Sequence, residues 1–193
     1  MFFKRKYEFR PDKNRSVLSK LYLTKQQRLK VLKWLLIAAA LVFLSILQDV
    51  IMSRVSIFGT STDLVAYAIL LVCVILDPEV GCVFALVSSS VYQFSGSAPG
   101  PYVIALLTIL GVIVAILRQS YLRYSFGSVY LSAAVAVMVY EIGLFFVGLF
   151  LEHTTMATFS HFLLTGVLGF MAIPVLYPVF TAIGKIGGET WKE

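Results

Sequence analysis

The chain has 193 residues, of which 59% are hydrophobic and only 13% charged, and its mean hydropathy is +0.89. A soluble domain is about half apolar and about a quarter charged, so a single aqueous core cannot bury this much apolar surface. The composition therefore excludes an ordinary soluble domain and predicts a chain surrounded by lipid. The net charge of +6 is uneven, because most Lys and Arg residues lie between Lys4 and Lys33.

Residues 1–30 form this basic segment. A run of basic residues can bind nucleic acid, but one that directly precedes an apolar span is typical of a cytoplasmic flank that contacts anionic lipid headgroups. We therefore expect membrane lipids and no nucleic acid as its partner. The first 15 residues show no periodicity and are predicted to be disordered. Thr24 and Gln27 have capping-box spacing, which predicts that the first helix begins near Lys25.

Six apolar segments follow along residues 31–185, and a short polar C-terminus occupies residues 186–193. The six lie at 34–52, 64–76, 80–94, 101–117, 126–151 and 157–183. The first, fifth and sixth are long enough to cross a hydrocarbon core, which takes about 20 helical residues. The second and third are shorter, and we expect a central hairpin covered by protein rather than lipid. The fold class predicted is all-α: a polytopic bundle of six transmembrane helices.

The charged flanks predict the orientation of this bundle. Cytoplasmic loops carry an excess of Lys and Arg, and six crossings place Arg118, Arg123 and Lys185 on the same side as the basic N-terminal segment. Arg54 is the one basic residue of the outer loops. We therefore expect both termini in the cytoplasm. The outer turn at 95–100 is rich in Gly, Pro and Ser, and Pro101 is predicted to open the fourth helix.

Two acidic residues within the spans are candidates for function, because an ionisable group there costs about 2.5–3.5 kcal/mol on insertion scales. Asp49, in the last turn of the first span, either makes a polar contact to a subunit or ligand or is an interfacial carboxylate paired with Arg54. Glu141 lies deep in the fifth span. It is expected to be protonated, hydrogen-bonded to a facing Tyr or Ser, or functional.

Catalytic and metal-binding signatures are absent from the sequence. His153 and His161 are isolated, and no Gly-rich phosphate loop or nucleophile motif occurs. Cys73 and Cys82 do not form a disulfide framework and are expected to pack as small apolar residues. We therefore expect no enzyme activity, no metal site and no cofactor. Pro174 and Pro178 are predicted to kink the last helix.

Several short motifs together resemble the rod shape-determining MreD family of small bacterial inner-membrane proteins. They are "LQD" (47–49), "TDL" (62–64), Gly81, "SGS-x-PG" (95–100), "ILRQSYLR" (116–123) and a final "P-x-x-x-P" (174–178). The resemblance covers about residues 34–185. The positions that carry over best are Gly81, Ser95, Gly96, Ser97, Pro99, Gly100, Pro174 and Pro178. The chain departs from the pattern at Thr62, where the family usually has Pro, and at Tyr92, where it often has Asp.

The resemblance implies a non-enzymatic, multi-pass scaffold of the cytoplasmic membrane that supports lateral peptidoglycan synthesis and sets cell shape. The partners that it implies are an MreC-like protein, an MreB-like filament, a RodA-like polymerase and a class B penicillin-binding protein. Candidate polar or interaction positions are Asp49, Asp63, Tyr92, Gln93 and Glu141.

A second class of protein has a similar length, helix number and hydropathy profile: the vitamin-binding subunit of energy-coupling-factor transporters. Asp49, Tyr92, Gln93 and Glu141 could line its outward-facing pocket. The first span, however, lacks the alanine-x-x-x-alanine stripe by which such subunits dock their membrane partner. The MreD-like scaffold is therefore the first hypothesis, and the vitamin-binding subunit is the alternative.

Overall fold

The computed structural model describes residues 25–52, 62–121 and 125–186, and this part of the chain is helical and contains no strand. Each of the six predicted apolar segments contains a helix, so the all-α class is confirmed. The elements are α2 (Lys25–Leu47), the π-helical turn η1 (Gln48–Met52), α3 (Leu64–Ile75), α4 (Pro78–Phe94), α5 (Val103–Tyr121), α6 (Phe126–Phe150), the 3₁₀ turn η2 (Met156–Thr158) and α7 (Phe159–Gly184).

Three of the described helical segments, Gln27–Val50, Phe126–Phe150 and Met156–Gly184, are long and apolar enough to cross a membrane. They are the same three that the sequence marks as long enough. The helices α3 and α5 are apolar but shorter. By helix length and composition the protein is therefore a membrane protein.

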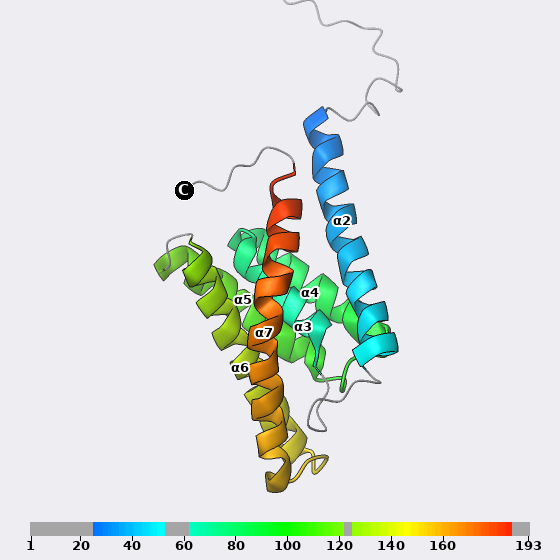
Figure 1. The fold of residues 1–193 in the computed structure, drawn as a ribbon, viewed down its shortest axis with the longest axis vertical. Coiled ribbons are helices and arrows are strands. Elements are labelled where there is room, and N and C mark those ends of the chain that lie inside the picture. Colours follow the sequence, from blue (N-terminus) through cyan, green and yellow to red (C-terminus); the bar gives the residue numbers. More distant parts are fainter. Residues whose placement is uncertain (1–24, 53–61, 122–124, 187–193) are drawn as a thin grey trace, which may run out of the picture.

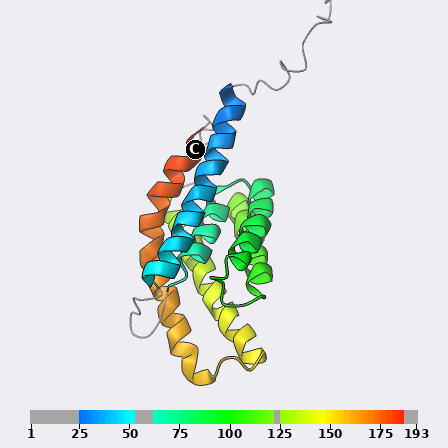
Figure 2. The same cartoon turned by 90° about the vertical axis from the view of Figure 1, so that its right-hand side faces the viewer.

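Helix α3 occupies the centre of the bundle and contacts α2, α4, α5, α6 and α7 (Figures 1 and 2). All of its residues from Val65 to Ile75 are buried. A helix that is hydrophobic all round is stable only where protein or lipid surrounds it, and here the neighbouring helices do so. The expectation of a protein-covered short helix is therefore confirmed for α3.

Helix α4 differs from the expectation, because it lies at the periphery of the bundle rather than at its centre. Val83, Leu86, Val87 and Val91 are each more than half exposed. The opposite face of α4 packs on α5 and α3. The hairpin of α3 and α4 thus has one buried and one half-covered helix.

Small residues allow the helices to approach closely, as is common in membrane bundles. A Cβ added at Gly81 would lie 3.3 Å from Ala115 Cβ, and one added at Gly111 would lie 2.8 Å from Ala85 Cβ. Gly81, a position of the MreD-like pattern, therefore serves the packing of α4 on α5. Cys73 is buried and Cys82 half-buried, and both are free thiols, as expected.

Helix α2 is the least covered of the long helices. Only 17% of its most apolar window is buried, against 50% for α6. It rests on α3 and α7, and Trp34 reaches Phe84 of α4 with ring centroids 6.0 Å apart. An apolar groove of about 460 Å³ lies between α2 and α4, with Ile69 of α3 among its lining residues.

The starts of two helices can be compared with the sequence-based predictions. The first helix begins at Lys25, as predicted, whereas Thr24 and the predicted disorder of residues 1–15 lie outside the described residues. Helix α5 begins at Val103 rather than at Pro101. Pro101 and Tyr102 form a turn in which Val103 N–H donates to Gly100 C=O at 3.2 Å.

The two prolines of the last span lie inside α7, and the helix continues through both. Pro174 cannot donate to the carbonyl of Phe170, four residues earlier. The hydroxyl of Tyr130, on α6, donates to this carbonyl at 3.5 Å. A neighbouring helix thus partly replaces the hydrogen bond that the proline removes, as membrane helices commonly require.

Candidate functional site: a polar cluster and cavity at one end of the bundle

Asp63 is the centre of a hydrogen-bonded cluster that joins three helices. It caps the N-terminus of α3, where Oδ1 accepts from Ala66 N–H at 3.1 Å. The same oxygen accepts from the hydroxyl of Tyr92, on α4, at 2.8 Å. Oδ2 accepts from the hydroxyl of Tyr140, on α6, at 2.9 Å. One carboxylate therefore satisfies a helix cap and two buried tyrosine hydroxyls.

Gln48 connects η1 to this cluster. Its side-chain Oε1 accepts from Val65 N–H at 3.0 Å, a second orphan donor in the first turn of α3. Its Nε2 donates to the hydroxyl oxygen of Tyr92 at 3.2 Å. The oxygen and the nitrogen of the Gln48 amide both form hydrogen bonds, and these fix the end of the first span against α3 and α4.

The turn after α4 belongs to the same cluster. The carbonyl of Ser97 lies 3.2 Å from the hydroxyl of Tyr92, and the Ser97 hydroxyl donates to Asp49 Oδ2 at 2.9 Å. Gly96 has φ +78°, a conformation that residues with a side chain rarely adopt. This backbone reversal turns the chain so that Ser97 faces Tyr92 and Asp49.

Glu141 forms a second pair beside the cluster. Its side chain, on α6, is only 3% exposed. Oε1 accepts from the hydroxyl of Tyr67, on α3, at 2.7 Å. The same hydroxyl lies 3.2 Å from the carbonyl of Thr165, on α7. Of the possibilities left open for Glu141, the structure shows the hydrogen bond to a tyrosine of a facing helix.

A cavity of about 320 Å³ opens beside these groups and is bounded by both carboxylates. Polar lining comes from Gln48, Thr62, Asp63, Tyr92, Ser97, Glu141, His161 and Thr165, and apolar lining from Pro99, Leu144 and Phe162. None of these residues is Lys or Arg. The described part of the lining is therefore rich in hydrogen-bond acceptors and carries no fixed positive charge.

The structure brings together three of the five predicted polar positions. Asp63, Tyr92 and Glu141 line the cavity. Asp49 is exposed, lines the neighbouring apolar groove and joins the cluster through Ser97. Its expected partner Arg54 lies outside the described residues. Gln93 lines neither space, and its Oε1 is buried without a hydrogen-bond partner among the described residues.

Tyr92 retains a polar role at a position where the MreD-like pattern often has an aspartate. Its side chain is 2% exposed, and its hydroxyl donates to Asp63. A tyrosine hydroxyl can donate to a neighbouring carboxylate, which a second aspartate can do only when it is protonated.

The sequence reasoning missed three of the donors. Tyr140 and Gln48 of the cluster and Tyr67 of the pair with Glu141 were not singled out, although each donates a side-chain hydrogen bond between helices. A signal was present, because a tyrosine within an apolar helix needs a partner for its hydroxyl when it is buried. Tyr140 directly precedes Glu141, and Gln48 directly precedes Asp49.

Among the residues that the structure describes, no group of three or more His, Cys, Asp or Glu side chains could hold a metal ion. The cluster itself consists of carboxylates, tyrosine hydroxyls and one amide. Such a set can bind and orient a hydrogen-bond donor.

Three motifs of the resemblance, distant in the sequence, meet at this one place. Gln48 and Asp49 come from "LQD", Asp63 comes from "TDL", and Ser97 comes from "SGS-x-PG". Hydrogen bonds through Tyr92 and Ser97 link all of them. The motifs therefore form a single structural unit. Comparisons of the chain with protein-family models, curated proteins and solved structures found no match.

Proposed function

We propose that the protein is a non-enzymatic scaffold of the bacterial cell-elongation complex, resident in the cytoplasmic membrane, where it supports lateral peptidoglycan synthesis and cell shape. The observation that carries the proposal is the convergence of "LQD", "TDL" and "SGS-x-PG" on one hydrogen-bonded cluster. These motifs, which carry the resemblance, thus form one hydrogen-bonded unit rather than separate loops. Their meeting supports the MreD-like resemblance and, through it, the function.

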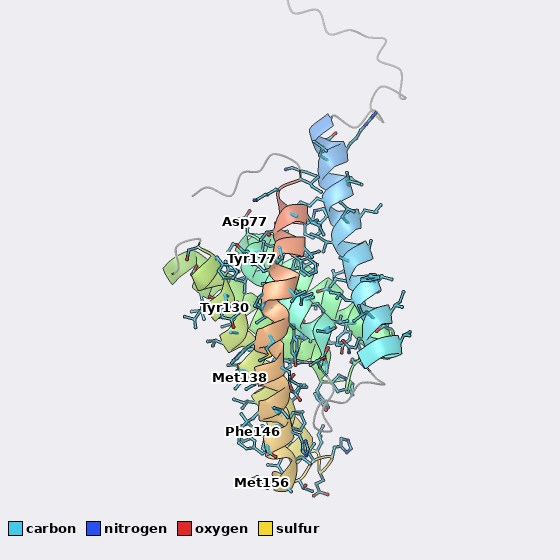
Figure 3. All side chains as sticks on the ribbon, in the orientation of Figure 1. Asp77, Tyr130, Met138, Phe146, Met156 and Tyr177 are labelled. Carbon is cyan, nitrogen blue, oxygen red and sulfur yellow. The ribbon has the colours of Figure 1, made fainter. Side chains whose placement is uncertain are left out.

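The proposed topology has six crossings with both termini in the cytoplasm. Figures 1 and 2 show the beginning of α2 and the end of α7 at the same end of the molecule. Figure 3 shows Asp77, in the turn between α3 and α4, toward that end, and Met156, between α6 and α7, at the opposite one. These positions support an even number of passes, and in the proposed topology the Asp63 cluster faces the outer side.

The proposed partners are an MreC-like protein, an MreB-like filament, a RodA-like polymerase and a class B penicillin-binding protein. The cluster supports a scaffold role because it ties η1, α3, α4 and α6 together at one end. Buried hydrogen bonds that fix the helix ends keep the surface above them in one arrangement, and a partner then binds with a smaller entropic cost.

Depletion of the protein in its native cell tests this function. We expect cells to become rounder and wider, because lateral wall synthesis loses its scaffold, and the measurement is cell width by phase-contrast microscopy. Re-expression of the wild-type chain is the control and restores the width. Depleted cells that keep their rod shape and width would refute the proposal.

The acceptor-rich cavity favours one alternative, the vitamin-binding subunit of an energy-coupling-factor transporter. Tyr92 and Glu141, two of the four residues expected in its pocket, do line this cavity, whereas Asp49 and Gln93 do not. The same depletion separates the two functions. A transport subunit predicts loss of vitamin uptake with unchanged shape, whereas a scaffold predicts changed shape with unchanged uptake.

A further inference from the structure

Glu141 has hydrogen-bonding capacity that the protein does not use. An ionised carboxylate offers about four acceptor sites on its two oxygens. Tyr67 donates to Oε1, and Oε2 accepts no hydrogen bond from the residues that the structure describes. The side chain is 97% buried by the protein, and the part that remains accessible borders the cavity of about 320 Å³. Oε2 is therefore accessible from the cavity, where a ligand can supply the donor that the described residues do not.

The other groups around the cavity cannot readily supply that donor. The hydroxyl protons of Tyr67, Tyr92 and Tyr140 are directed at Glu141 and Asp63. Among the described residues of the lining there is no Lys or Arg, and the imidazole of His161 belongs to an exposed residue. Two carboxyl groups face the space, and none of the lining residues that the structure describes carries a fixed positive charge. The electrostatic potential there favours a cation, and its effect is larger in a low-dielectric surrounding than in water.

The shape of the cavity distinguishes between kinds of cation. Metal ions such as Na⁺ or Ca²⁺ prefer a shell of several converging oxygens, and the described residues hold no group of three or more potential metal-binding side chains. One wall is apolar, formed by Pro99, Leu144 and Phe162. A volume of about 320 Å³ fits a small organic molecule rather than a bare ion. An aromatic ring beside a carboxylate also favours an organic ammonium group.

We propose that this cavity binds a small organic ammonium ion, with its N–H donating to Glu141 Oε2 and its apolar part resting against Phe162. This site is proposed independently of the scaffold function, and its binding can be measured on the purified chain without partner proteins or cells. The expected ligand is a primary ammonium group attached to a small carbon skeleton.

The test compares two probes of nearly equal shape, benzylammonium and benzyl alcohol, by calorimetric titration of the full chain in a non-ionic detergent at low salt. We expect benzylammonium to bind at least about tenfold more tightly, because only its charged group pairs with Glu141. Glu141→Gln should abolish this preference and leave benzyl alcohol binding unchanged. The matched control is Glu152→Gln, an exposed residue between α6 and η2 that does not line the cavity. It should keep the preference.

A second variant keeps the test decisive if Glu141→Gln fails to fold, which thermal unfolding of the detergent-solubilised chain will show. Phe162→Leu removes the aromatic wall and should weaken benzylammonium binding about threefold or more. Equal affinity of the two probes for the wild-type chain would overturn the proposal, and so would an unchanged preference in a folded Glu141→Gln variant. Equal weakening in Glu152→Gln would also overturn it, because the binding would then reflect general surface charge.

Discussion

Asp63 illustrates how one side chain can serve local structure and tertiary structure together. An aspartate before a helix caps an orphan N–H, and its replacement by an apolar residue typically costs about 0.5–2 kcal/mol. Here the same carboxylate also accepts from Tyr92 and Tyr140. The start of α3 is therefore coupled to the positions of α4 and α6.

Tyr140→Phe removes one of these donors and keeps the ring. Tyr140 is fully buried, and its hydroxyl donates to Asp63 at 2.9 Å. We expect the variant to be less stable by about 1–2 kcal/mol, since a buried acceptor loses a donor in a site where hydrogen bonds are worth about 0.6–2 kcal/mol. Equilibrium unfolding in mixed micelles measures the change.

Tyr177→Phe is the control for this substitution. Tyr177 is half-buried on α7, and its ring packs edge-on against Phe126 at 4.9 Å, a contact that the substitution retains. We expect less than about 0.5 kcal/mol for the control, as for most changes away from buried networks. Equal losses in the two variants would show that the Asp63 hydrogen bond contributes nothing specific.

At this scale the sequence predicted the acceptors better than the donors. Glu141 stands out because charges are rare in apolar segments, Asp63 because it belongs to the "TDL" motif of the resemblance, and Tyr92 because it departs from that pattern. Tyr140 lies 77 residues from Asp63 and Tyr67 lies 74 residues from Glu141. Pairs so distant are joined only by the packing of the helices, which one sequence does not reveal.

Packing of the helices depends on glycines at their contacts. A Cβ added at Gly169 of α7 would lie 2.6 Å from Val137 Cγ1 and 3.1 Å from the ring of Tyr67. Tyr67 is the residue that donates to Glu141. The close contact of α7 with α3 and α6 is thus connected to the polar pair.

Gly169→Ala is therefore expected to destabilise the bundle by about 1–3 kcal/mol, because overpacking forces neighbours to shift. Unfolding in mixed micelles measures it. Gly127→Ala, in the first turn of α6, is the matched control, because a Cβ there meets nothing within 4 Å. The control should be neutral or slightly stabilising, since Ala favours a helix by about 1 kcal/mol over Gly. A tolerated Gly169→Ala would contradict the close packing.

The helices themselves were largely predictable from hydropathy, because each apolar run coincides with one described helix. The extent to which neighbouring helices cover α3 and α4 was not predictable from hydropathy. Both apolar runs are short, and nothing in their composition distinguishes a central from a peripheral helix. Turn chemistry at Pro101 also placed the start of α5 two residues too early. There Pro101 and Tyr102 form a turn, closed by the hydrogen bond from Val103 N–H to Gly100 C=O, before the helix begins.

The whole molecule has a compact centre around α3 and two less covered parts. One is α2, which contacts α3 and α7. The other is the hairpin of α6 and α7, whose tip extends beyond the end of α2 (Figure 1). Phe150 and Met156 at this tip are 88% and 69% exposed. The polar cluster joins η1, α3, α4 and α6 by side-chain hydrogen bonds.

The proposed scaffold function requires this polar end to be intact. Asp63→Asn keeps a side chain that can cap the helix. It replaces one of the two carboxylate oxygens that accept hydrogen bonds from Tyr92 and Tyr140 by an amide NH₂ group, which cannot accept. Asp77→Asn is the matched control, because Asp77 is exposed, makes no side-chain cap hydrogen bond and lies toward the opposite end (Figure 3). Both variants are expressed in depleted cells at levels matched by immunoblotting.

The width of those cells is the most direct measurement of the central claim. We expect Asp77→Asn to restore the width of wild-type rods, and Asp63→Asn to leave cells wider and rounder because the end of the bundle no longer presents one fixed arrangement. Asp63→Asn cells with the wild-type width, at equal protein level, would contradict the claim that the cluster of Asp63, Tyr92 and Tyr140 supports the control of cell shape.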